Sequence, residues 1–589
     1  MTGKTERRYK SITKRTAIVT ACALLAAATV DFSVITAGIS GRLPETVVTL
    51  LPSVPVAQAA PPPVDAAGRE LSRQREEAER ERVRQQIRQD REQRGTGVRD
   101  ETKQGETKAE DEVRFRLAGV TSDPSDILAP ETVQALAAFY IGRDVSLSDL
   151  TELVQKINDV YAEKGYVTCK AYLPPQTIEN GSVHIGLMEG KTGDISLSGN
   201  RNTRADYIRG RLPLREGAVQ NFNGLNDSLY RFNATNDAQL GITVKAGKEP
   251  GTSDYEIAVR EPKQDVFTLF ADNAGSASTG AWREGLNYTN RSLSGRRDSA
   301  TVGYVRAKGQ DSVNLNYTAP VGRRGARILL DYSTASSELI EQSWRQFDIH
   351  GHSWSLSAAW VQPLIVNRTT RTEARFGVYR QNSQTDMLGG TQPWLDSRNN
   401  NLYGSFSMTS YGKSSVFYHQ HYVGAGRTNF YRANTGDYAS KNYALYRLNG
   451  FYQKTWKNGH ALSGRLGLQW RGTRDLPSAE QFFMGGLYSV RGYKQDSVGG
   501  DSGVTFSAEY AVPVDRKRAL SLYGFFDYGS LWGRSAYEDH VLKSVGFGLK
   551  GNICRQVFMN LAAGFPLERS LNGSRASRAR VHLGMNAQF

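Results

Sequence analysis

Two short segments near the C-terminus place a charged side chain among apolar and aromatic neighbours. The first, Ser489 to Tyr493, carries Arg491 between a valine and a glycine. The second, Phe525 to Gly529, carries a lone carboxylate, Asp527, in an apolar run. A guanidinium presents a planar fork of N–H donors that matches the two oxygens of a carboxylate. These residue types allow a bidentate ion pair that would fasten one segment to the other; the alternative is that water solvates both charges.

The segment around Arg491 is a long glycine-rich loop. Residues 476–503 contain six glycines, too many for a helix or a regular strand. The permissive backbone of these glycines favours a long, ordered loop. Contact between Arg491 and Asp527 requires this loop to fold back towards the second segment.

Residue patterns that carry catalysis are missing from the sequence. It contains no nucleophile elbow, no phosphate-binding loop and no HExxH zinc motif. The pairs His350/His352 and His419/His421 could each face one side of a strand, but no third ligand accompanies them. We predict no catalysis, no cofactor and no metal site.

The elements that must hold the two charged segments are strands. Hydrophobic residues make up 39% of the 589, with 58 glycines and 28 tyrosines, which suits a barrel whose strands are apolar on one face only. From Val266 to Phe589, short runs alternate between apolar and polar residues, as in Val313, Leu315 and Tyr317 with Asn314 and Asn316 between them. A soluble β-sandwich gives the same alternation. We predict a transmembrane antiparallel β-barrel over residues 266–589.

The alternation also orients the second charged segment. Phe525, Asp527 and Gly529 share one face of their strand, whereas Leu522 and Phe526 lie on the other and more apolar face. The apolar face should meet lipid, so Asp527 should point into the lumen. A last strand ends the chain, with one face that consists of Val581, Leu583, Met585, Ala587 and Phe589.

Basic residues exceed acidic ones in the predicted barrel, by 38 to 22. Two interpretations remain open: basic loops that meet anionic lipid headgroups, or a basic lumen. Nucleic acid is not a predicted partner, because no helix or stripe concentrates the charge.

The N-terminal part reads as an export signal followed by a charged helix. Residues 1–59 combine a basic start, an apolar run too short to span a bilayer and a small-residue cleavage pattern, which predicts a signal peptide rather than a membrane anchor. Residues 60–94 contain a helix with opposite charges at i,i+4, as in Arg73–Glu77, Arg75–Glu79 and Glu76–Arg80. Its apolar stripe is too thin for a core, so it is either a solvated linker helix or a helix that sits in a wet pore. Residues 95–111 read as a flexible linker.

Two similar units of mixed helix and strand should fill the middle of the chain. Residues 112–190 read as a strand, two helices and two strands, and residues 191–265 repeat this order. An exposed strand edge in such a unit could receive an extended peptide; the alternative is a structural spacer.

Only three cysteines occur, Cys22 within the predicted signal and Cys169 and Cys554 in separate parts, which excludes a disulfide framework.

The two charged segments resemble the VRGY loop and the FxDxG strand motif of the outer-membrane transporter and insertase superfamily, which includes the two-partner secretion (TpsB) transporters. The repeated unit is similar to a POTRA domain, and the last strand resembles the signal by which outer-membrane barrels are recognised for assembly. The resemblance implies a barrel of about sixteen strands, two periplasmic α+β POTRA domains and an N-terminal helix. It assigns a loop motif, a barrel-strand motif and an assembly signal to the following residues: Val490, Arg491, Gly492 and Tyr493; Phe525, Asp527 and Gly529; Val581, Leu583, Met585 and Phe589.

This resemblance also implies a function. A TpsB-like chain in the Gram-negative outer membrane would export a large exoprotein, of the haemolysin, adhesin or contact-dependent toxin class, whose N-terminal secretion domain the POTRA units capture while the helix plugs the pore at rest. Its other partners would be outer-membrane lipid, lipopolysaccharide and the barrel-assembly machinery. The alternative within the superfamily is an outer-membrane insertase. A passive porin would lack the periplasmic units, and a siderophore receptor would have a globular plug and more strands.

Overall fold

The computed structural model describes residues 65–92, 98–100, 113–390, 392–432, 435–532, 540–571 and 574–589. The predicted signal peptide, 1–59, and most of the predicted linker lie outside these residues.

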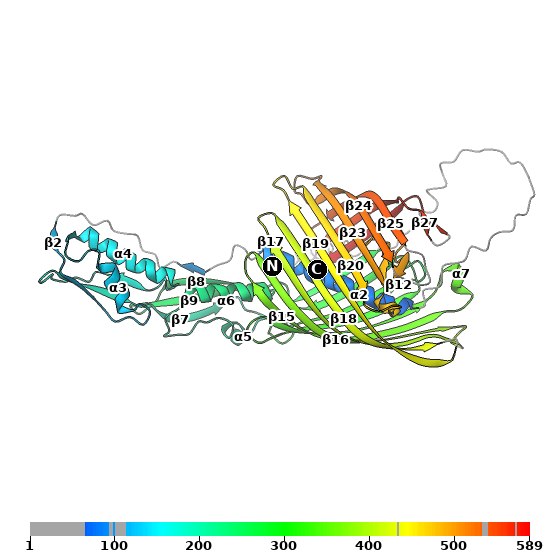
Figure 1. The fold of residues 1–589 in the computed structure, drawn as a ribbon, viewed down its shortest axis with the longest axis horizontal. Coiled ribbons are helices and arrows are strands. Elements are labelled where there is room, and N and C mark those ends of the chain that lie inside the picture. Colours follow the sequence, from blue (N-terminus) through cyan, green and yellow to red (C-terminus); the bar gives the residue numbers. More distant parts are fainter. Residues whose placement is uncertain are drawn as a thin grey trace, which may run out of the picture. The chain divides into compact units, whose positions relative to one another are not determined.

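Sixteen antiparallel strands close into a barrel, which confirms the predicted fold class (Figure 1). Each strand pairs with the next one along the chain, and the last pairs with the first through a register that joins Thr268 to Gln588 and Asp272 to Gly584. Closure leaves no open edge, as lipid demands. The strands are β10 (Asp265–Asp272), β11 (Arg283–Asn290), β12 (Ser299–Ala307), β13 (Gln310–Val321), β14 (Ala326–Glu338), β15 (His350–Val366), β16 (Thr370–Met387), β17 (Gln392–Tyr411), β18 (Ser415–Arg432), β19 (Asp437–Thr455), β20 (Ala461–Arg471), β23 (Ser502–Pro513), β24 (Leu520–Trp532), β25 (His540–Asn552), β26 (Val557–Pro566) and β29 (Arg580–Gln588).

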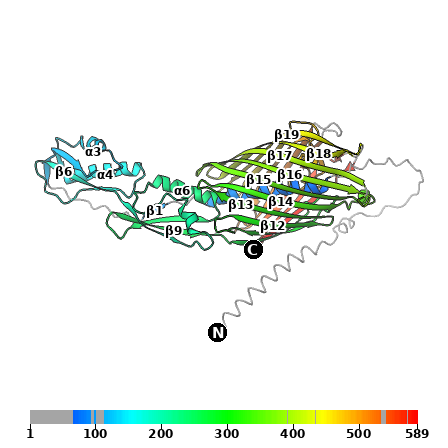
Figure 2. The same cartoon turned by 90° about the horizontal axis from the view of Figure 1, so that it is seen from below.

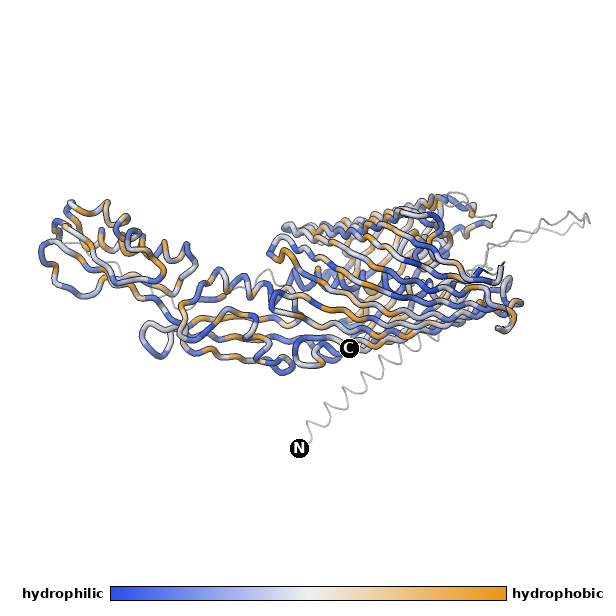
Figure 3. The backbone as a smooth tube through the Cα atoms, turned by 60° about the horizontal axis from the view of Figure 1, so that its bottom comes forward, coloured by the Kyte–Doolittle hydropathy of each residue, from blue (hydrophilic) through white to orange (hydrophobic). Residues whose placement is uncertain are grey.

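The two faces of the barrel wall differ in the way that the alternation predicts. Large apolar side chains such as Leu315, Leu402 and Trp470 are exposed, whereas polar ones such as Gln381 and Ser383 are fully buried. Figure 3 shows hydrophilic and hydrophobic residues following one another along the strands. Because side chains alternate across a strand, the exposed apolar set faces outward and the buried polar set faces the lumen.

The lumen contains the charged helix α2 (Ala66–Glu92). It begins next to Asp65, whose carboxylate accepts a hydrogen bond from the Gly68 amide at 2.9 Å. In Figures 1 and 2, α2 is seen between the strands of the barrel. Its thin apolar stripe packs on the inner wall in two places: Leu71 with Ala335 near one end, and Ile87 with Tyr411 and Val416 near the other.

The first α+β unit has two strand groups and a helical pair around one core. Helix α4 starts at a capping box in which Ser146 and Asp149 exchange hydrogen bonds, and it buries Leu150, Leu153 and Ile157. The elements are β2 (Arg114–Arg116), β3 (Gly119–Ser122), α3 (Pro130–Ala137), β4 (Asp144–Ser146), α4 (Leu147–Glu163), β5 (Lys170–Tyr172) and β6 (Ser182–Met188). The short strands β3 and β4, which the sequence pattern did not reveal, join β6 and β2 respectively.

The second unit has its own core and a four-stranded sheet in the order β1-β8-β9-β7. Its elements are β7 (Lys191–Ser198), α5 (Ala205–Arg209), α6 (Phe222–Thr235), β8 (Gln239–Ala246) and β9 (Thr252–Arg260). The fourth strand, β1 (Val98–Asp100), comes from the segment that the sequence predicted to be a flexible linker. That prediction is wrong for these residues, because their backbone pairs in parallel with β8.

The glycine-rich loop between β20 and β23 is ordered. It contains a short 3₁₀ helix, η3 (Ser478–Glu480), and a two-stranded sheet of β21 (Phe482–Met484) and β22 (Val498–Gly500). Three further short elements lie elsewhere between barrel strands: α7 (Gln342–Arg345), β27 (Ser570–Leu571) and β28 (Ser574–Arg575). Among the described residues, no helix is both long enough and apolar enough to cross a membrane.

Candidate functional site

The structure brings the two charged segments together inside the barrel. The Arg491 guanidinium donates from Nε and Nη2 to the two oxygens of Asp527, each at 2.7 Å. The Arg491 backbone amide donates to the same carboxylate at 3.0 Å. Asp527 is fully buried and Arg491 is 2% exposed. The two residues thus form a planar, desolvated ion pair, the arrangement for which a guanidinium is suited.

A second carboxylate, Glu509 of β23, also binds Arg491, and we call Arg491, Asp527 and Glu509 together the clasp. It lies 2.7 Å from Nη1 of Arg491 and also accepts hydrogen bonds from Arg465 and Lys550. The ring of Phe525 lies below the guanidinium, with 3.6 Å between its centroid and Cζ of Arg491. The Arg491 guanidinium is therefore matched by carboxylates in its plane and by an aromatic ring on one face.

Two glycines of the motifs allow the loop to approach the wall. Gly492 has φ +91°, and a Cβ on it would lie 3.1 Å from the carbonyl carbon of Gly564. A Cβ on Gly529 would lie 2.6 Å from Sδ of Met484 and 2.9 Å from Cγ2 of Val490. The first glycine is required by both backbone conformation and space, and the second by space alone.

The rest of the loop motif fixes the loop to the last strands. The Gly492 amide donates to Nε2 of His582 at 2.9 Å, and the Tyr493 hydroxyl lies 2.6 Å from the carbonyl oxygen of Glu568. Val490 is fully buried in an apolar cluster with Met484, Tyr493, Val498, Leu531 and Leu542. The loop tip is thus held by apolar packing as well as by the ion pair.

Charged pairs hold α2 along the inner wall. Arg283 of β11 lies 3.1 Å from Glu77 and also pairs with the wall residue Asp272. Arg375 of β16 lies 2.9 Å from Glu79. Glu77 and Glu79 of α2 therefore bind the barrel wall.

A third wall arginine fixes the far end of α2. Arg371 lies 3.0 Å from Asp90 of the helix and also pairs with Glu373 of its own strand. Asp90 further accepts a hydrogen bond from the Tyr411 hydroxyl. These three arginines point into the lumen, and each is paired there with at least one carboxylate.

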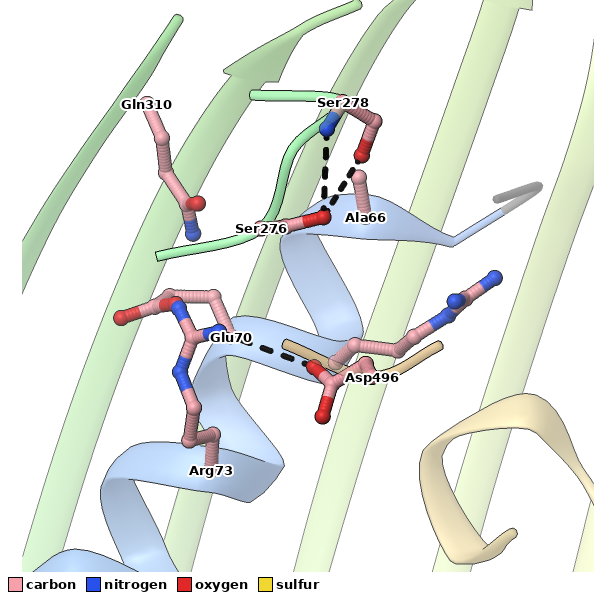
Figure 4. A pocket seen from close by; sticks show the side chains of 8 residues that line it. Ala66, Glu70, Arg73, Ser276, Ser278, Gln310 and Asp496 are labelled. Carbon is pink, nitrogen blue, oxygen red and sulfur yellow. Dashed lines mark hydrogen bonds and ion pairs between the residues drawn. The ribbon is translucent and has the colours of Figure 1, made fainter. Parts of the chain in front are cut away.

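The first turns of α2 contact the folded-back loop. The Ser72 hydroxyl lies 2.9 Å from the carbonyl oxygen of Ala479, and the Arg69 guanidinium lies over the ring of Phe483. Arg73 pairs with Glu70 and lies 3.6 Å from Asp496, at a small cavity between helix and loop (Figure 4). Helix and loop therefore contact each other inside the barrel.

The C-terminal end of α2 meets the second α+β unit. The side-chain amide of Gln89 donates to the carbonyl oxygen of Asn233 at 3.0 Å, near the end of α6. Arg371 donates to the carbonyl oxygen of Ala234 at 2.7 Å. Carbonyls at a helix C-terminus are free to accept and attract positive charge, so this end of α6 suits such donors.

The remaining predicted residues lie apart from the clasp. In the last strand, Val581 is exposed, and β29 pairs on both sides, with β26 and β10.

One histidine of each i,i+2 pair has another partner. His350 lies 2.9 Å from an oxygen of Asp348, and His421 lies 2.8 Å from the Tyr446 hydroxyl. In the part of the chain that is described, no three or more His, Cys, Asp or Glu side chains are grouped so that they could hold a metal ion.

Glu509 is the residue of the clasp that the sequence reasoning missed. It occupies an inward position of β23, two residues after Ser507. The Ser507 hydroxyl, which is uncharged, accepts a hydrogen bond from Nη2 of Arg491 at 3.1 Å. The signal was present, since Glu509 is a lone acid in an alternating apolar strand, as Asp527 is. His582, which accepts the hydrogen bond from the Gly492 amide, is a second residue that the sequence reasoning missed; it lies on the face of the last strand opposite Val581 and Leu583.

A closed barrel of sixteen strands, a polar helix in its lumen, a loop clasped inside and α+β units before it define an outer-membrane transporter of the two-partner secretion type. The sequence profile of the haemolysin secretion/activation protein ShlB/FhaC/HecB family matches residues 251–551, and that of the ShlB-type POTRA domain matches residues 115–190. The chain therefore belongs to the ShlB/FhaC/HecB family, and its first unit is a POTRA domain.

Individual relatives agree with this assignment. The chain is 24% identical over 461 residues to the heme/hemopexin transporter protein HuxB of Haemophilus influenzae (strain 86-028NP), which covers 74% of this chain and 80% of the relative. It is 24% identical over 461 residues to the outer membrane transporter CdiB of Escherichia coli, covering 71% and 75%. The solved structure of CdiB from Escherichia coli has the same fold, with a TM-score of 0.65 at 18% identity, covering 88% of this chain and 98% of that one.

Proposed function

We propose that this chain exports an unfolded partner exoprotein from the periplasm to the cell surface through its barrel, and that α2 occludes the lumen at rest. The observation that carries this proposal is the way α2 is held, by ion pairs to Arg283, Arg371 and Arg375 rather than by a wide apolar face. Polar partners can be exchanged for water, so such a helix can leave without exposing a sticky surface. Transport then needs a path and a binding site, but no catalytic step and no cofactor.

Deletion of α2 tests this proposal. Removing residues 66–92 should raise the single-channel conductance of the purified protein in planar bilayers several-fold. A matched control is the double substitution Glu81→Gln/Arg84→Gln, which alters an exposed ion pair on the same helix and should leave the conductance unchanged. Unchanged conductance after the deletion would mean that α2 does not obstruct the pore.

Capture of the partner is assigned to the α+β units, the second of which we take to be another POTRA domain because it repeats the element order of the first. Strand addition needs an edge; β5 lies at the edge of its sheet, and β7 does so beyond its first two residues, which pair with residues 217–219. A soluble fragment of residues 112–263 should bind the unfolded N-terminal secretion domain of the partner. Absence of binding at high protein concentration would contradict this assignment.

The remaining partners follow from the barrel surface. Its outward apolar side chains suit outer-membrane lipid and lipopolysaccharide, and the terminal strand that ends in Phe589 suits recognition by the barrel-assembly machinery. The exported protein would be of the haemolysin, adhesin or contact-dependent toxin class. The family assignment favours this exporter over an insertase.

A further inference from the structure

The strand β1 occupies an edge at which another chain could bind. Val98, Arg99 and Asp100 pair in parallel with Ile242, Thr243 and Val244 of β8. Val98 packs against the core of the second unit, and its amide donates to the side chain of Asn226 at 3.2 Å. The remaining side of β8 is paired with β9. The strand β1 is thus an added edge strand of the sheet of the second unit. Its apolar residue, Val98, faces the core, and its charged neighbour, Arg99, faces outward.

A short covalent connection joins this strand to the helix in the pore. Only residues 93–97 separate the end of α2 from β1. An extended chain of this length reaches about 20 Å. The helix itself, with 27 residues, is about 40 Å long. Travel of α2 by its own length along the barrel axis therefore carries its C-terminal end farther than the connection reaches while β1 stays paired.

Release of β1 removes this restraint. The next described residue of the first unit is Val113, so the connection from α2 would then comprise residues 93–112, which can extend to about 70 Å. That length exceeds the travel that α2 needs. The restraint on the plug is thus set by three residues of β1, whose backbone pairing an incoming strand could replace.

We infer that β1 is a latch: an extended segment of the exported protein displaces it from β8, and this displacement frees α2 to leave the lumen. The inference rests on the proposed function of the chain as an exporter. The segment that fits is a parallel strand with an apolar residue at the position of Val98 and polar residues beside it. The contact of Gln89 with Asn233 places the end of α2 beside the connection that leads from α6 into β8, so the same segment acts close to both restraints.

A disulfide across the latch tests this. Arg99→Cys/Thr243→Cys joins register partners of β1 and β8, and it is made together with Cys554→Ser to remove the exposed thiol. In planar bilayers, the oxidised full-length protein should open at least tenfold less often than the same protein after reduction. The control, Thr243→Cys/Glu256→Cys, links β8 to β9 and leaves β1 free, so its openings should not depend on reduction. Equal opening of the oxidised and reduced latch variant would overturn the inference.

Two further measurements separate the latch from the export function. A synthetic peptide of residues 95–103, added at millimolar concentration to match a tethered strand, should raise the opening frequency of the unmodified protein several-fold, whereas a scrambled peptide should not. If the peptide leaves the opening frequency unchanged, displacement of β1 by a strand does not release α2. In a variant without residues 66–92, oxidation of the latch should have no effect on conductance, and a persisting effect would exclude action through α2. None of these outcomes depends on a partner, whereas failure of the unmodified protein to secrete one would overturn only the export function.

Discussion

Replacement of Arg491 by alanine should release the loop from the barrel wall. Arg491 donates three hydrogen bonds to Asp527, two from its side chain and one from its backbone. Arg491→Ala leaves Asp527 fully buried with the backbone bond alone, and removal of one partner from a buried ion pair costs about 3–5 kcal/mol. Since each 1.36 kcal/mol is a factor of ten, the undocked loop should become roughly a hundred to five thousand times more populated.

Replacement of Asp527 by alanine should have a smaller effect. The Arg491 head then keeps Glu509 and Ser507, so the loss is that of charge-assisted hydrogen bonds alone, about 1.5–3 kcal/mol. The double variant should be no worse than Arg491→Ala, because it no longer buries an unpaired carboxylate. Arg465→Ala is the matched control: this arginine is partly exposed and Glu509 keeps two other cations, so the change should be below about 1 kcal/mol.

Loop undocking and secretion are the two quantities to measure. Hydrogen exchange of residues 484–498 reports undocking, and the faster migration of the unheated barrel on a denaturing gel shows whether the barrel has assembled. All variants should assemble, and secretion of the partner should fall in the order of the exchange rates. Additive losses in the double variant would mean that Arg491 and Asp527 act independently, and the clasp would have to be abandoned.

Three further changes test other parts of the structure. Gly529→Val should displace Met484 and Val490, cost about 1–3 kcal/mol and accelerate hydrogen exchange in the loop; unaltered exchange would show that the loop does not depend on this close approach. Glu79→Gln should leave Arg375 without its charged partner on α2, weaken the hold on the helix by about 1.5–3 kcal/mol and raise the opening frequency in bilayers, and an unchanged frequency would argue against ion-pair retention. Burial raises the pKa of the Cys169 thiol to about 11, so at pH 7.5 the reactive thiolate is scarce, and maleimide should modify the exposed Cys554 but reach Cys169 only after denaturation; mass spectrometry of the native protein would reveal any early modification of Cys169.

The barrel and the inward position of Asp527 could be predicted because both follow from the alternation of apolar and polar residues along single strands. Alternation along β24 placed Asp527 on the inner face without knowledge of its neighbours. Contact between Asp527 and Arg491 was favoured by the resemblance of the two segments to paired family motifs, because charge alone left solvation by water open. Glu509 obeyed the same rule but was missed, since it stands outside both motifs.

Helix spacing predicted only some of the partners of α2: the exposed pair Glu76–Arg80 forms as expected, but other pairs do not. Opposite charges at i,i+4 predicted the pairs Arg73–Glu77 and Arg75–Glu79, but the two acids turn to Arg283 and Arg375 of the wall. Tertiary contacts override local ones when they are desolvated and bidentate. The strand β1 was missed for a related reason: three residues carry no periodicity, and their conformation is set by the edge of β8.

The inner wall that faces α2 has a consequence for the chain that passes through it. Serine, glutamine and asparagine side chains such as Ser353, Gln381, Asn399 and Gln420 are buried there. A vacated pore with such walls wets readily, because each group regains its hydrogen bonds from water. An unfolded polypeptide sliding through it would meet few apolar patches to adhere to, so friction stays low along the whole path. Such a wall gives the passing chain no direction, so directed movement would need a source of free energy outside the pore.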